Sequence, residues 1–153
     1  MNYYAGIGAR ATPDAIKKYM TELAHFLNTQ KWYLRSGGAQ GADKAFEAGA
    51  GIRKFIYHPE DWNMEAVKIA RDHHPAWSRL SPYVQLLMAR NAMIVLSNTL
   101  TEPVKFVVCW TPNGEIVGGT GHSLRIAQTY NVPIINFGNL KLPEIEEKIQ
   151  ELL

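Results

Sequence analysis

The sequence predicts an α/β fold built on a mostly parallel sheet. Short apolar runs alternate with segments of helical periodicity, and glycine-rich turns follow several of the runs. The chain has 153 residues, of which 46% are apolar and 20% charged, the size and composition of one folded domain.

The first strand is expected at Tyr3 to Ile7, an apolar run that leads into a glycine. A helix should follow and end near Asn28, because Thr12 can cap it and Pro13 suits its first turn. Residues Trp32 to Arg35 form the expected second strand.

The glycine-rich turn from Ser36 to Asp43 leads into a short helix around Phe46. Phe55 to Tyr57 is the expected third strand. The pattern over 60–81 is less clear, apart from a helix around 64–71.

Ser81 and Pro82 begin a strongly apolar helix that runs towards Met93. Residues 94–96 either continue this helix or form a short strand, since a short apolar run fits both. Lys105 to Trp110 is dense in β-branched and aromatic residues, which predicts a central strand.

A polar loop over 111–119 precedes a helix expected at Thr120 to Tyr130 and a last strand at Val132 to Phe137. The terminal segment from Leu142 to Leu153 is an amphipathic helix, whose apolar face either covers its own sheet or joins a second copy of the chain. Strands separated by helices, with right-handed crossovers, give a doubly wound, Rossmann-like sheet. Without an internal repeat or linker, residues 1–153 should form a single domain.

Several classes of protein are disfavoured by composition. Cys109 is the only cysteine, so neither an intramolecular disulfide nor a cysteine-based zinc site is available, and its apolar neighbours predict a buried thiol. His73 and His74 are adjacent and lack a third ligand, so we predict no metal site. We also predict no cofactor. The start shows no signal peptide and no apolar run approaches the about 18 residues of a membrane helix, so a cytoplasmic protein without a membrane partner is expected.

Three glycine-rich segments follow predicted strands and precede predicted helices, so all three should lie along one edge of the sheet, where ligands bind in such folds. The first, with Gly6, Gly8, Ala9 and Arg10, is similar to a dinucleotide-binding fingerprint that has alanine as its third small residue. An acidic residue is missing at the end of the second strand, which excludes the usual NAD site. Arg10 is instead expected either to face a phosphate or to be a solvated loop arginine.

The other two segments also combine glycines with side chains that can donate hydrogen bonds. Glycines let backbone N–H groups turn towards an anion, and a helix start adds positive potential. Asp43 could accept a hydrogen bond from a ribose hydroxyl or cap the next helix. The second segment contributes Ser36, Gly37, Gly38, Ala39, Gly41 and Asp43, and the third contributes Gly118, Gly119, Thr120, Gly121, His122 and Ser123.

Two further positions are candidates for ligand contact. Arg90, followed by Asn91, lies in an apolar helix, so it should either pair with Asp43 or Glu47 or meet the ligand. Trp110 ends the central strand, where its indole either stacks on a base or packs into the core.

These motifs resemble a known family. The runs from Gly6 to Arg10 and from Ser36 to Asp43, with Ala89, Arg90 and Asn91, resemble the Rossmann-like domain of DNA-processing protein A (DprA) over nearly the whole chain. DprA belongs to the SLOG superfamily with the Lonely Guy (LOG) phosphoribohydrolases, and small single-domain members are common in phages and bacteria. The resemblance implies a homo-oligomer that binds nucleotides.

The chain departs from the LOG pattern at two positions. His122 stands where the resemblance places a threonine and Arg125 where it places a catalytic glutamate, so hydrolysis would need a substitute such as Asp43, Glu47 or Glu115. The leading hypothesis is therefore a sensor or sequestering protein for a nucleotide or a nucleotide-derived small molecule. A nucleotide N-glycosidic hydrolase, in which Arg90 also acts, is the first alternative. Single-stranded DNA binding in the DprA manner is the second, although the net charge of +2 does not by itself indicate it.

Overall fold

The computed structural model describes residues 1–153 and contains one five-stranded parallel sheet with the order β3-β2-β1-β4-β5. The predicted doubly wound, Rossmann-like architecture is confirmed. Strand order reverses between β1 and β4, whose last residues Gly8 and Trp110 lie side by side. The strands are β1 (Asn2–Gly8), β2 (Trp32–Ser36), β3 (Lys54–Ile56), β4 (Phe106–Trp110) and β5 (Ile134–Asn136).

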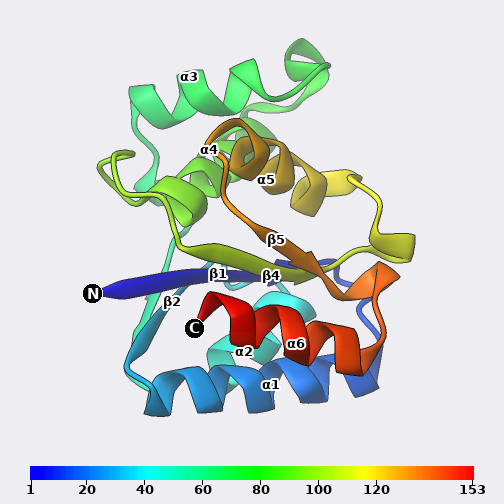
Figure 1. The fold of residues 1–153 in the computed structure, drawn as a ribbon. Helices are drawn as coiled ribbons and strands as arrows, with labels where there is room; N and C mark the ends of the chain where they lie inside the picture. Colours follow the sequence, from blue (N-terminus) through cyan, green and yellow to red (C-terminus); the bar gives the residue numbers. More distant parts are fainter.

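Helices cover both faces of the sheet (Figure 1). On one face lie α1 (Asp14–Thr29), α2 (Ala42–Gly49) and α6 (Leu142–Leu152). On the other lie α4 (Pro82–Leu96) and α5 (Gly118–Thr129), and α3 (Met64–Asp72) packs on the outer side of α4. Short 3₁₀ turns occur at Pro59–Asp61, Trp77–Arg79, Pro112–Gly114 and Phe137–Asn139. None of the helices is both long and apolar enough to cross a membrane.

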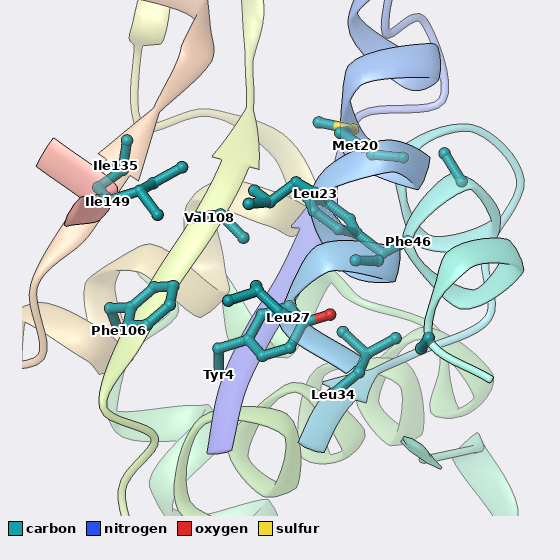
Figure 2. Close-up of a cluster of buried hydrophobic side chains, with 14 of the residues drawn as sticks. Tyr4, Met20, Leu23, Leu27, Leu34, Phe46, Phe106, Val108, Ile135 and Ile149 are labelled. Atoms are coloured by element: carbon teal, nitrogen blue, oxygen red, sulfur yellow. The ribbon is translucent and has the colours of Figure 1, made fainter. Parts of the chain in front are cut away.

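The core beneath α1, α2 and α6 is built from large apolar side chains (Figure 2). Phe46 of α2 and Leu27 of α1 are fully buried, and Tyr4 stacks on Phe106 with ring centroids 5.9 Å apart. Ile145 and Ile149 of α6 join the same cluster, so the apolar face of the terminal helix covers its own sheet. Truncating a side chain such as Phe46 to alanine would cost about 3–5 kcal/mol.

The second core fixes α4 between the sheet and α3. Met93, Ile94, Val95 and Leu96 are all buried, so residues 94–96 continue the helix and do not form a strand. A helix that is covered on opposite sides has no polar face, which removes the amphipathic pattern that would have identified it. This packing fixes the position of Arg90 on α4.

Two predicted helix starts differ from the observed ones. Thr12 does not cap α1: its hydroxyl donates to the carbonyl of Ala9 at 2.6 Å and closes the turn after β1, and Pro13 occupies the capping position. The helix α5 begins at Gly118, two residues before the predicted start, so the glycines form its first turn.

Candidate functional site

A cleft of about 490 Å³ opens at the carboxyl ends of β1 and β4, where the strand order reverses. This is the usual ligand position in doubly wound sheets, and the volume suits a small molecule. Segments from both halves of the chain line it: the loop after β1, the loop after β2, one face of α4, the end of β4 and the first turn of α5.

The structure brings residues of all three glycine-rich segments, together with α4, to this one cleft. The predicted site residues that line it are Gly8, Ala9, Arg10, Ala39, Asp43, Arg90, Asn91, Gly118, Gly119, Thr120 and Ser123.

The remaining predicted residues lie outside the lining. Several hold the loops in place: the Ser36 hydroxyl donates to the carbonyl of Gly6 at 2.6 Å, and Gly41, at φ 94°, lets the second loop approach the first, since a Cβ there would lie 2.7 Å from the carbonyl oxygen of Ala9. The residues outside are Gly6, Ser36, Gly37, Gly38, Gly41, Glu47, Trp110, Glu115, Gly121 and His122.

Trp110 packs into the core and does not line the cleft. Its side chain is partly buried against the cluster beneath α1, α2 and α6. Of the two expectations for this indole, core packing is the one that the structure supports, because the side chain points to that face of the sheet.

His122 is completely buried and cannot donate to a ligand in the cleft. Its Nε2–H donates to the carbonyl of Ala70 at 2.9 Å, and Asn91 donates to its Nδ1 at 3.2 Å. Burial lowers the pKa of His122 to about 4, so the ring is neutral at pH 7. The imidazole therefore ties α5 to α3 and α4, a role that the sequence does not reveal.

Asp43 lies on the floor of the cleft with only 5% of its surface exposed. It does not cap its own helix: its Oδ2 accepts a hydrogen bond from the N–H of Ala39 at 3.3 Å. Burial raises the pKa of Asp43 to about 6, although Arg90 and the amides of Ala39, Gly37 and Gly8 act in the opposite direction. The group is a hydrogen-bond acceptor at neutral pH.

Arg90 reaches from α4 towards the second loop. Its Nη1 donates to the carbonyl of Gly37 at 2.8 Å, while its buried Nε has no partner in the protein. It forms no ion pair with Glu47, which binds Lys44 and Lys54 instead, and it attracts Asp43 without direct pairing. Burial lowers the pKa of Arg90, but an arginine at this depth still carries its charge.

The first turn of α5 presents backbone donors that no protein group uses. Val117 precedes the helix without a side-chain cap, and the first amide with an acceptor is that of Gly121, which donates to the carbonyl of Val117 at 2.8 Å. The N–H groups of Gly118, Gly119 and Thr120 therefore remain free. In the first loop, by contrast, the N–H of Ala9 already donates to the carbonyl of Trp110 at 3.1 Å.

The sequence-based prediction missed most of the cleft's apolar wall. Leu87 and Ile94 share the face of α4 that carries Arg90, three residues before it and four after it. Helical spacing from Arg90 would have indicated both. The other missed lining residues are Ile7, Met88, Thr111, Pro112 and Val117. No group of three or more histidine, cysteine or acidic side chains lies close enough together to hold a metal ion.

Neither a protein-family model nor a curated protein sequence matches the chain. Among solved structures, the fold is similar to that of DNA processing protein A from Helicobacter pylori, which is described for its unique single-stranded DNA binding mode. The match has a TM-score of 0.63 and covers 97% of this chain and 73% of that chain. Sequence identity is 20%, so the similarity shows a shared, DprA-like fold.

Proposed function

We propose that the cleft binds a nucleotide or a nucleotide-derived small molecule whose phosphate lies at the first turn of α5. The observation that carries this proposal is the uncapped start of that helix, where three amides face the cleft region without an acceptor. Free amides and the positive end of the helix dipole together favour a phosphate. The exposed Arg10 lines the same cleft and adds a positive charge.

The apolar wall supports a ligand that is larger than phosphate alone. Leu87, Met88 and Ile94 line the cleft, and its volume of about 490 Å³ exceeds the needs of a bare anion. Small-molecule sites combine such walls with a few fixed polar groups. A base or sugar can pack on this surface while the phosphate occupies the helix start.

Titration calorimetry with mononucleotides and ADP-ribose tests the proposal, and each nucleotide is compared with its nucleoside. We expect the phosphate to strengthen binding by about tenfold or more, since a hydrogen bond to a charged group contributes about 1.5–3 kcal/mol. Affinities no tighter than millimolar across the panel would refute the proposal.

A matched pair of variants at Gly119 locates the phosphate. Gly119→Pro removes one amide donor in the first helical turn, where proline is tolerated. Gly119→Ala keeps the donor, and its added Cβ lies 3.8 Å from Met88 Cε, an ordinary contact. We expect the proline variant to bind about tenfold more weakly than the alanine variant. Equal affinities would place the phosphate elsewhere.

The comparison with the Helicobacter pylori protein favours a second candidate function, the binding of single-stranded DNA. In this case the cleft would hold a nucleotide of the strand, with further phosphates on the surface. A gel shift with an oligonucleotide should weaken steeply as salt rises, because each phosphate contact releases counterions. Competition by a mononucleotide would show that both use the cleft. No observation favours the hydrolase: Glu47 and Glu115 lie outside the cleft and Asp43 is its only carboxylate.

A further inference from the structure

The loop after β2 already holds an anion, and the chain itself supplies it. The Oδ2 of Asp43 accepts a hydrogen bond from the N–H of Ala39 at 3.3 Å, and Ala39 lines the same cleft. This amide belongs to one of the glycine-rich segments that the sequence offers to a phosphate. The carboxylate of Asp43 therefore occupies the place of an anion on this side of the cleft.

The carboxylate of Asp43 can still accept hydrogen bonds from a ligand. An ionised carboxylate has about four acceptor positions, and one backbone donor, the N–H of Ala39, binds to this one. Asp43 lines the cleft, so its remaining capacity is directed to a ligand. It can accept a hydrogen bond from a hydroxyl or an amine, but it repels a phosphate oxygen.

The first turn of α5 has the opposite character. Its amides at Gly118, Gly119 and Thr120 have no acceptor, so this part of the same cleft donates hydrogen bonds and attracts negative charge. The cleft thus has one accepting side at Asp43 and one donating side at α5. A ligand that forms hydrogen bonds with both sides must carry a phosphate for the start of α5 and, at a different position, a hydrogen-bond donor for Asp43.

We infer that the cleft binds its ligand in one orientation, with the phosphate at the start of α5 and a hydroxyl or amine donor on Asp43, so that Asp43 determines specificity for ligands that retain this donor. The inference rests on the proposed nucleotide binding and adds the ligand's orientation and chemical class. In a ribonucleotide, either the sugar hydroxyls or the exocyclic amine of the base can supply the donor.

Calorimetry at pH 7.5 with AMP, GMP and CMP, whose bases all carry an exocyclic amine, identifies the ribonucleoside monophosphate that binds most tightly. Two analogues of it then distinguish the sources of the donor: the 2′,3′-dideoxy analogue lacks the sugar hydroxyls, and a second analogue lacks the amine of the base. We expect one of them to bind about tenfold more weakly than the parent, because the buried acceptor is left without its partner.

The variant Asp43→Asn, in which an amide replaces the carboxylate, should reduce that discrimination to about twofold or less. Glu47→Gln is the matched control: Glu47 lies on the same helix outside the cleft, and the variant should keep the tenfold difference. If Asp43→Asn does not fold, the comparison of analogues on the unchanged protein remains the test. Equal binding of parent and both analogues overturns the inference but leaves the proposed function intact, whereas no binding of any nucleotide overturns the proposed function itself.

Discussion

Acid is expected to destabilise this protein through one imidazole, that of His122. The ring is fully buried, and each nitrogen has a partner that fixes its role: Nε2 donates to Ala70 and Nδ1 accepts from Asn91. A second proton would sit on Nδ1 and face the N–H group of Asn91. Burial and this arrangement favour the neutral ring, and the pKa of His122 is lowered to about 4.

The size of the effect follows from linkage between protonation and folding. The pKa in the folded protein, about 4, lies below the ordinary value of 6.5, so the unfolded chain binds the proton more tightly. The stabilisation is fully present above pH 6.5 and is lost as the pH falls towards 4. Since each pKa unit corresponds to about 1.4 kcal/mol, the loss between pH 7.5 and 4.5 is about 2.5 kcal/mol.

Urea unfolding followed by tryptophan fluorescence measures this loss. The variant His122→Gln offers an amide donor and a carbonyl acceptor but cannot titrate, and His25→Gln removes an exposed histidine as a control. The wild type and the control should each lose about 2.5 kcal/mol more than His122→Gln between the two pH values. The carboxyl group of Asp43 stabilises the folded protein at low pH, and this contribution is lost as the pH rises through about 6. Because all three proteins contain Asp43, its contribution cancels in the comparison. Equal losses in all three would refute the reasoning.

Three further predictions can be checked by the same unfolding assay or by thiol labelling. Tyr4→Phe removes a buried hydroxyl that has no partner and should raise the free energy of unfolding by about 1 kcal/mol; a decrease would contradict this. Gly121→Ala would place a Cβ 2.7 Å from the carbonyl carbon of Ile116 and should cost about 2 kcal/mol or more. At Gly118 an added Cβ would have no atom within 4 Å, so Gly118→Ala should cost only the strain of its φ of 67°, about 1 kcal/mol. Equal losses of stability in the Gly121 and Gly118 variants would contradict the packing argument. Burial raises the pKa of Cys109 to about 12, so a disulfide reagent at pH 8 should label it about 100-fold more slowly than in denaturant, and rapid labelling of the native protein would disprove this.

The fold was predictable because its elements alternate and its strands carry strong local signals. Residues 94–96 stayed ambiguous for a physical reason: α4 is covered by the sheet on one side and by α3 on the other, so hydrophobic residues surround it. The start of α5 was placed too late because glycines are poor helix formers in isolation, and here tertiary contacts override that preference.

The position of the cleft was also predictable, since the carboxyl ends of parallel strands meet at one edge of the sheet. What the sequence could not show is which amides remain available there. The N–H of Ala9 is taken by Trp110 and that of Ala39 by Asp43, and both pairings depend on how separate loops meet in space. Sequence reasoning likewise could not tell that the His122 ring points into the protein interior.

The reversal of strand order between β1 and β4 has a consequence for how an occupant acts on the chain. One wall of the cleft comes from residues 7–94 and the other from residues 111–123, and the sheet joins them through the register of Gly8 with Trp110. A molecule that touches both the loop after β1 and the first turn of α5 becomes a non-covalent cross-link between segments about a hundred positions apart in sequence, closing a loop that the unfolded chain leaves open. Amide hydrogens on both sides of this junction should then exchange more slowly together when the cleft is filled.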